Sequence, residues 1–153
     1  MDNAFSYAID NGMCTEDAYP YTSADGTTGG FGSCSTCTDA VTISSCSDVA
    51  PSDQISLMNA VASGPVSVAI EADTRVFQSY SYGVITSSDC GTNLDHGVLI
   101  VGYGQENGVD YWLVKNSWGP DWGLDGYVKI GRSESTSDDG ICGIAIQPSF
   151  PVI

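Results

Sequence analysis

The sequence predicts an α+β fold in which a small antiparallel β-barrel follows two short helices. Two observations support this prediction. Before residue 64, the stretch at 2–11 has apolar residues at helical spacing. A second stretch begins at a possible helix-capping residue and ends at Gly64-Pro65, a pair that stops a helix. After that point, short apolar stretches alternate with turn signals, a pattern typical of antiparallel hairpins. At 153 residues with 42% hydrophobic content, the chain is long enough to bury its own core.

The first helix is expected at residues 2–11 and is followed by a glycine that ends it. Residues 20–40 are rich in Gly, Ser and Thr and are expected to form a loop. The second helix begins after Ser52 or Asp53, because either side chain can cap its first turn, and it runs to about residue 62. The apolar face of the first helix comprises Ala4, Phe5, Ala8 and Ile9.

The remaining elements are expected to be short strands joined by tight turns. Asn107-Gly108 is the strongest turn signal, because both residues tolerate the positive φ of a two-residue hairpin. We interpret the second part of the chain as a small β-barrel with a helix at one end. The expected strands are 41–43, 66–70, 97–103, 111–116, 126–130 and 144–147.

The net charge of −15 is unevenly distributed, since no Lys or Arg precedes Arg75. Such a field repels nucleic acid and anionic membrane surfaces. The negative charge indicates either that the chain is adapted for solubility in an acidic compartment or that it prefers basic partners. No apolar run approaches the ~20 residues of a membrane span. Met1 is followed directly by Asp2, so no signal peptide is expected at this start.

The only histidine of the chain, His96, lies in LDHGVLIVGYG, and Asn116 lies in VKNSWG, two residues before Trp118. An imidazole that acts as a base needs a partner that fixes its tautomer, and a nearby aromatic ring can exclude water from that contact. We therefore interpret His96 and Asn116 as the base and its orienting partner in a cysteine nucleophile site. We expect a hydrogen bond between them, with Trp118 packed over it. The alternative is a buried structural histidine near a turn asparagine.

LDHGVLIVGYG, YWLVKNSWGPDWGLDGYVKI and CGIAIQPSFPV resemble the C-terminal half of papain-like cysteine proteases, the papain and cathepsin L family. The resemblance begins at MDNAFSYAIDNG and continues through TEDAYPY and GPVSVAIEA to PSFPVI, so it covers essentially the whole chain. It implies a papain-like fold. Residues 1–50 would be a remnant of the helical domain and residues 51–153 the β-barrel domain, with the last residues returning toward the helical domain.

The resemblance also implies a cysteine endopeptidase whose nucleophile is missing from this chain. The catalytic cysteine of the family lies in an upstream segment with no counterpart here. The six cysteines lie in Ser-, Asp- or Gly-rich contexts or next to acids, without the cation or helix N-terminus that lowers a thiol pKa. We therefore expect the isolated chain to be inactive. The alternatives are a catalytically inactive papain-fold binding or structural subunit, and the heavy chain of a processed two-chain enzyme.

By the same resemblance, Trp118 and Trp122 line the leaving-group side of the cleft. Asp95 either favours the protonated form of the neighbouring imidazole or caps a turn. An apolar specificity pocket with a polar far end is expected, which suits a Leu, Val or Phe side chain of the substrate. Its residues would be Met1, Ala69, Leu94 and Gly97, with Gln147 at the far end.

Six cysteines indicate an oxidising compartment. The resemblance implies a Cys90–Cys142 disulfide and pairs Cys34 with the missing segment. A Cys14–Cys37 pair is a further guess. The Cys34-x-x-Cys37 spacing could suggest zinc, but the other cysteines fit no standard finger, so no metal and no cofactor are expected. A lysosomal, vacuolar or extracellular location is expected. The expected partners are a protein or peptide substrate and the missing N-terminal segment or a light chain.

Overall fold

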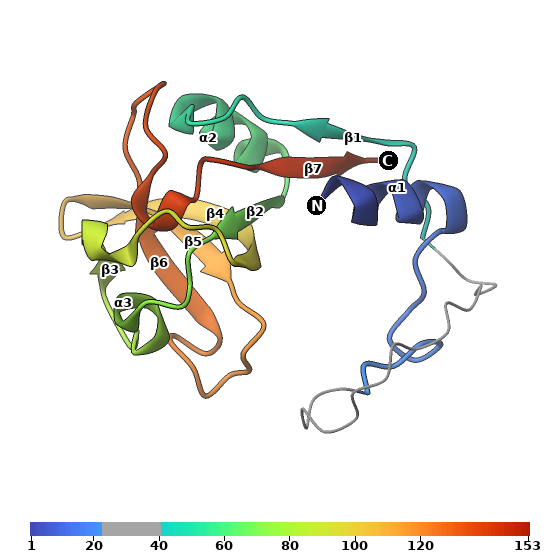
Figure 1. The fold of residues 1–153 in the computed structure, drawn as a ribbon, viewed down its shortest axis with the longest axis horizontal. Coiled ribbons are helices and arrows are strands. Elements are labelled where there is room, and N and C mark those ends of the chain that lie inside the picture. The colour runs from blue at the N-terminus through green and yellow to red at the C-terminus, as the bar shows by residue number, and fades with distance from the viewer. Residues whose placement is uncertain (23–40) are drawn as a thin grey trace. The chain divides into compact units, whose positions relative to one another are not determined.

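A computed structural model describes residues 1–22 and 41–153. The chain forms two compact units, one of residues 1–47 with 151–153 and the other of residues 48–150 (Figure 1). Each unit is described by itself. None of the helices in these two ranges is both long and apolar enough to cross a lipid bilayer.

The first unit contains helix α1 (Asp2–Asn11), as predicted. Asp2 lies in its first turn, where a carboxylate interacts favourably with the helix dipole. Ala8 is the buried residue of the helix. The N–H of Gly12 bonds the carbonyl of Ala8, and its φ of 71° ends the helix, as glycine permits.

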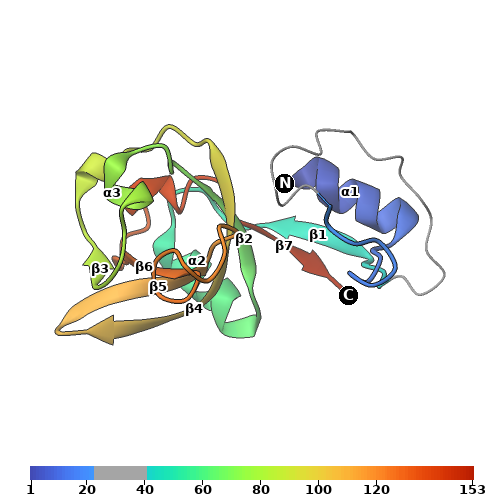
Figure 2. The same ribbon diagram turned by 90° about the horizontal axis from the view of Figure 1, so that it is seen from below.

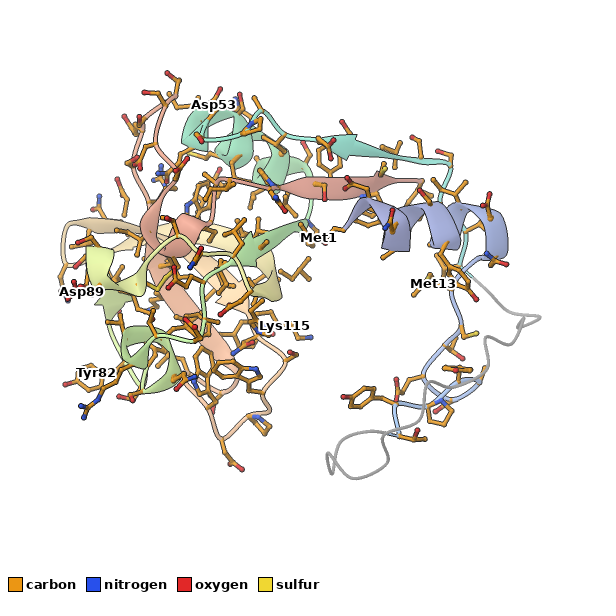
Figure 3. The ribbon with its side chains drawn as sticks, viewed as in Figure 1. Met1, Met13, Asp53, Tyr82, Asp89 and Lys115 are labelled. Carbon is orange, nitrogen blue, oxygen red and sulfur yellow. A yellow bond between two sulfur atoms is a disulfide. The ribbon has the colours of Figure 1, made fainter. Side chains whose placement is uncertain are left out.

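Helix α2 (Gln54–Ser63) begins the second unit, and Asp53 rather than Ser52 caps it (Figure 3). The Asp53 carboxylate accepts the backbone N–H groups of Ser56 and Ile55 at 2.9 and 3.1 Å, and the Ser56 hydroxyl at 2.7 Å. These hydrogen bonds hold the pKa of the Asp53 carboxyl below its usual value. The two bonds from Ser56 contribute most, and the bond from the Ile55 backbone contributes less.

The strands form one seven-stranded sheet in the order β1-β7-β2-β4-β5-β6-β3. The long β4–β5 hairpin is its most extended part (Figure 2). The β2–β4, β4–β5 and β5–β6 pairs are antiparallel, whereas β3 and β6 are parallel. The strands are β1 (Ser45–Asp48), β2 (Val66–Ile70), β3 (Val84–Ile85), β4 (His96–Glu106), β5 (Val109–Lys115), β6 (Tyr127–Gly131) and β7 (Ser149–Val152). The α+β, papain-like prediction is confirmed. The sheet is not closed, with β1 and β3 at its edges, whereas a small β-barrel was expected.

Two strand predictions failed. Residues 144–147 form no strand. They follow a 3-10 helix, η2 (Ile141–Gly143), in which Cys142 and Gly143 have φ of 59° and 72°. Within 41–43, Val41 makes only an isolated bridge with Met13. The sequence analysis also missed six short elements: α3 (Arg75–Gln78), the strands β1, β3 and β7, and the 3-10 helices η1 (Ser88–Cys90) and η2.

The core lies between α2 and one face of the sheet. Trp112, Ile100 and Val114 from the central hairpin are fully buried, as are Leu57 of α2 and Phe77 of α3. At ~25 cal/mol per Å² of apolar surface, each such side chain contributes about 1.5–3 kcal/mol. This core fixes β4 and β5 and so the residues at their ends.

Candidate active site

His96 and Asn116 lie together at the open end of the β4–β5 hairpin. His96 is the first residue of β4, and Asn116 directly follows β5. The His96 Nε2 atom lies 2.8 Å from the Asn116 Oδ1 atom, and Asn116 is 8% exposed. The expected hydrogen bond between the two side chains is confirmed.

The backbone beside Asn116 determines which ring nitrogen is available for chemistry. Asn116 Oδ1 also accepts the N–H of Ser117 at 2.8 Å, which fixes the orientation of the amide group. An oxygen has no proton to give, so His96 Nε2 must carry the proton and donate it. The Nδ1 atom is then the ring nitrogen left for proton transfer.

A β-bulge in β4 separates the regular pairing at the open end of the hairpin from the pairing at the turn end. The register changes between Ile100, which pairs with Val114, and Gly102, which pairs with Leu113, so Val101 is the extra residue. His96 and Asn116 lie on the open-end side of the bulge, an even number of residues from Ile100 and Val114, and regular alternation therefore places them on one face of the sheet. The uniformly apolar sequence around Val101 gave no signal for the bulge.

Aromatic rings cover the His96–Asn116 contact. The Trp118 ring lies 5.2 Å from the imidazole centroid at an interplanar angle of 35°, as expected, and Trp118 is 42% exposed. Phe77 is fully buried and packs edge-on against His96 and Trp118, with ring centroids 6.4 and 5.4 Å apart. Trp122 lies 4.9 Å from Phe77 and donates its Nε1–H to the Gln78 carbonyl. Sequence reasoning missed Phe77, which lies in a four-residue helix without a periodic pattern.

The Asp95 carboxylate bonds the backbone at the end of β2. Asp95 Oδ1 accepts the N–H of Ala72 at 2.8 Å, and the Asp95 N–H bonds the carbonyl of Ile70 at 3.0 Å. These bonds join the loop before His96 to a segment more than twenty residues earlier in the chain and do not cap a local turn.

Three of the predicted pocket residues lie near the start of β4. Ala69 pairs with Gly97 across β2 and β4, and Leu94 is half-buried in the loop before His96. A Cβ atom at Gly97 would have no neighbour within 4 Å, so the strand has open space in front of it there. Gln147 is exposed after η2. Met1 belongs to the other unit, so its place beside these residues remains a prediction.

The Cys90–Cys142 disulfide forms as predicted, with the Cα atoms 4.8 Å apart. Cys14 is also disulfide-bonded, whereas Cys46 is a half-buried free thiol. Cys34 and Cys37 lie outside the described residues, and so do the predicted Cys14–Cys37 pair and the Cys34-x-x-Cys37 zinc spacing. In the described ranges, no three His, Cys, Asp or Glu side chains are grouped closely enough to hold a metal ion.

An imidazole oriented by an amide oxygen is the arrangement in which a histidine can act as a general base. Comparison with known proteins defines the family. The family described as "Papain family cysteine protease" matches residues 1–152. The chain therefore belongs to the papain family of cysteine proteases.

The chain is similar to plant members of this family. It is 49% identical to Germination-specific cysteine protease 1 of Arabidopsis thaliana, with 99% of the chain and 40% of that protein aligned. Its identity to Cysteine proteinase EP-B 1 of Hordeum vulgare is 49%, over 99% of the chain and 41% of that protein. The chain thus spans less than half the length of these relatives.

Solved structures show the same fold. The bromelain protease of Ananas comosus, in complex with the E64 inhibitor, matches with a TM-score of 0.88 and 39% identity, over 99% of this chain and 68% of that chain. Digestive procathepsin L 3 of Tenebrio molitor matches with a TM-score of 0.87 and 42% identity, over 100% of this chain and 48% of that chain.

Proposed function

We propose that this chain supplies the base and its orienting partner to a papain-like cysteine endopeptidase. The observation that carries the proposal is the hydrogen bond from His96 Nε2 to Asn116 Oδ1, with Trp118 packed against the imidazole. This arrangement fixes the tautomer and orientation of the ring and keeps Nδ1 for the reaction. In this reading Trp118 and Trp122 form the leaving-group side of the site.

The proposed reaction needs a cysteine thiolate next to His96 Nδ1. The thiolate attacks the peptide carbonyl carbon, and the protonated imidazole gives its Nδ1 proton to the departing amine as the C–N bond breaks. The neutral imidazole then takes a proton from water, which attacks the acyl-enzyme and releases the thiolate. Asn116 holds the ring throughout, because its contact is with Nε2.

We propose that the thiolate comes from a part of the enzyme beyond these 153 residues, either an N-terminal segment or a light chain. Cys14, Cys90 and Cys142 are in disulfides and cannot act as thiolates. The curated relatives are more than twice as long as this chain. In this proposal the unit of residues 1–47 with 151–153 is part of the helical domain, and the unit of residues 48–150 carries the base.

The substrate of the proposed enzyme is a protein or peptide with an apolar side chain, such as Leu, Val or Phe, beside Ala69, Leu94 and Gly97. The open space in front of Gly97 supports this placement. We place Met1 at the same pocket and Gln147 at its far end. The Cys90–Cys142 disulfide supports a lysosomal, vacuolar or extracellular location, since such bonds persist in oxidising compartments.

The test uses the native protein that contains this chain and a fluorogenic peptide with Leu or Phe at the position expected to fill the pocket. We expect thiol-dependent cleavage, with kcat/KM reduced by about 10³-fold or more in His96→Ala and less in Asn116→Ala. Glu134→Ala, at an exposed site, is the matched control. Full activity in His96→Ala would refute the role of the imidazole.

The same preparation decides between the enzyme and the inactive subunit. A thiol-directed epoxide should label one cysteine outside this chain and abolish cleavage. The isolated 153-residue chain should neither cleave the peptide nor react in this way. A native protein that shows neither cleavage nor labelling is the inactive binding or structural subunit instead.

A further inference from the structure

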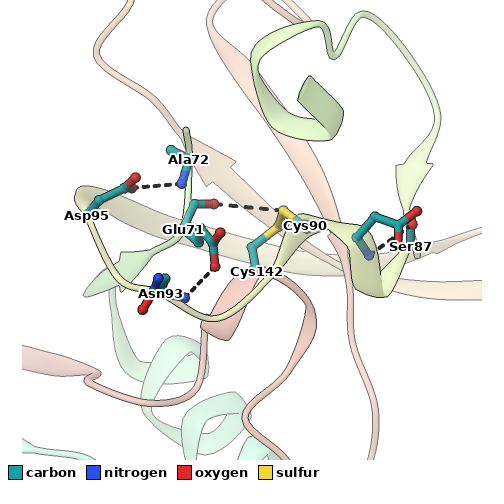
Figure 4. Close-up of a disulfide and its surroundings, with 8 residues drawn as sticks. Glu71, Ala72, Ser87, Cys90, Asn93, Asp95 and Cys142 are labelled. Atoms are coloured by element: carbon teal, nitrogen blue, oxygen red, sulfur yellow. Dashed lines mark hydrogen bonds between the residues drawn. A yellow bond between two sulfur atoms is a disulfide. The ribbon is translucent and has the colours of Figure 1, made fainter. Parts of the chain in front are cut away.

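The segment from Cys90 to Asp95 leads directly into His96 and is attached to the end of β2. Ile70, the last residue of β2, is the register partner of His96. The next residue, Glu71, lies beside both the disulfide and this segment (Figure 4).

Glu71 contacts both halves of the disulfide and the middle of the segment. Its backbone N–H bonds the Cys142 carbonyl at 2.9 Å, and its own carbonyl oxygen lies 3.8 Å from the Cys90 sulfur. That sulfur has no proton to donate, so the second interaction is a packing contact. The Glu71 carboxylate accepts the N–H of Asn93 through Oε2. One residue therefore joins the disulfide to the backbone three residues before His96.

Glycines on both sides bring the segment close to its supports. Gly91 has a φ of 74°, and a Cβ atom there would overlap the Glu71 carboxylate. On the other side, a Cβ atom at Gly143 would lie 2.8 Å from Leu94 Cδ2 and 3.3 Å from Thr92 Cα. The segment thus lies between Glu71 and Gly143 with no space to shift toward either.

The Glu71 carboxylate acts on this segment rather than in an ion pair. Among the described residues, the Lys and Arg side chains in ion pairs are Lys129 and Arg132, whose partners are Glu106 and Asp110. A hydrogen bond from a backbone N–H to a carboxylate is stronger than one between neutral groups. Asp95 makes the reciprocal contact, from the segment back to Ala72 at the end of β2. Two carboxylates pointing in opposite directions thus fix the segment.

We propose that Glu71 is a positioning residue for His96, acting through the segment Cys90–Asp95. The inference rests on the proposed function, because it assigns Glu71 to the same reaction. Loss of the carboxylate frees the Asn93 N–H, lets the segment move and displaces the imidazole from Asn116 and from the thiolate.

The first test compares Glu71→Ala, Glu71→Gln and Asp89→Ala in the native protein, with rates expressed per active site titrated by a thiol-directed epoxide. We expect kcat of Glu71→Ala to fall by about 10- to 100-fold, the scale of effect of a misplaced catalytic group. Glu71→Gln should keep most activity, because its amide oxygen can still accept the Asn93 N–H. Asp89→Ala, an exposed carboxylate beside the same disulfide, should match the wild type. Unchanged kcat per titrated site in Glu71→Ala would overturn the proposal.

Leu94 lies in the same segment and is part of the proposed pocket, so a second comparison separates the two effects. The Glu71→Ala loss should be equal for peptides with Leu and with Gly at the pocket position. A loss confined to KM for the Leu peptide would show that Glu71 positions the pocket and not the base, which contradicts the proposal.

A third measurement does not depend on activity. His96 is the only histidine, so the imidazole N–H signals of the isotopically labelled 153-residue chain belong to one ring. The Nε2–H donated to Asn116 should be protected from exchange in the wild type, Glu71→Gln and Asp89→Ala, and should exchange about tenfold faster in Glu71→Ala. If Glu71→Ala does not fold, Glu71→Asp, with a carboxylate one methylene shorter, takes its place. Equal exchange in all variants would overturn the proposal, whereas an inactive native protein with the expected exchange would overturn only the proposed function.

Discussion

The two ends of the β4–β5 hairpin fix their charged groups in different ways. At the turn end, Lys129 Nζ lies 2.7 Å from Glu106 Oε2, and Arg132 Nη2 lies 3.5 Å from Asp110 Oδ1. At the open end, beside His96, carboxylates accept backbone N–H groups instead. The turn end is therefore held by ion pairs, and the open end by hydrogen bonds that involve no lysine or arginine.

This difference matches the chemistry proposed for each end. A lysine or arginine next to His96 would oppose the positive charge that the imidazole must carry when it protonates the leaving amine. Backbone donors order the segment without adding a formal charge. At the turn end, the Arg132 guanidinium lies 5.5 and 5.7 Å from the ring centroids of Tyr103 and Trp112. We infer that the ion pairs at the turn end stabilise the fold, whereas the hydrogen bonds at the open end hold His96 in position.

Replacement of both Cys90 and Cys142 by Ala should have the largest effect. The disulfide closes a loop with a sequence separation of 52, for which the chain-entropy model gives about 3–4 kcal/mol of stability. Because the bond lies at the open end, we expect activity per titrated site to fall as well. Urea unfolding and active-site titration measure the two effects separately. A loss of stability with unchanged activity would mean that the disulfide does not hold the segment before His96.

The sequence was sufficient for the parts of the site that lie in short continuous motifs. His96, Asn116 and Trp118 lie within a few residues of characteristic glycines and tryptophans, and their mutual contacts follow from two neighbouring strands. Phe77 could not be predicted in the same way. It reaches the site from a four-residue helix, and only the packing of three rings around it shows its place.

The failures of the fold prediction also have local causes. The predicted strand at 144–147 was inferred from apolar residues, yet Cys142 and Gly143 take left-handed conformations that end any extended run. The bulge at Val101 has no sequence signature, because each residue around it is apolar or glycine and either register buries apolar side chains. A small β-barrel was expected, whereas the sheet is not closed, because hairpin patterns predict neighbouring strands but do not determine whether the outer strands meet.

Arg132→Ala tests the turn end and should reduce stability without changing catalysis. The Arg132 side chain is only 8% exposed, contacts two aromatic rings and pairs with Asp110, so its loss should cost about 1–3 kcal/mol. Arg132→Lys keeps the positive charge but not the planar guanidinium group, and should recover only part of the lost stability. Urea unfolding gives the cost, and kcat per titrated site should stay within about twofold of wild type. A larger fall in kcat would mean that the two ends of the hairpin are coupled.

Lys129→Met should have the smallest effect, and one that depends on pH. The hydrogen bond to the Glu106 carboxylate raises the Lys129 pKa above its ordinary value of 10.5. A group whose pKa is raised by folding stabilises the protein below its unfolded pKa and loses that contribution as the pH rises through the higher folded value. The urea midpoint of the wild type should therefore exceed that of Lys129→Met by a constant amount between about pH 7 and 9, and the difference should shrink above about pH 10.5. High salt should reduce this difference in urea midpoint at every pH below about 10.5, since the Lys129–Glu106 pair is partly exposed and salt screens it. The Lys129 Nζ atom lies 5.1 Å from the Tyr111 ring centroid. A difference that persists unchanged to about pH 12 would mean that the packing of the Lys129 side chain, and not its charge, stabilises the turn end.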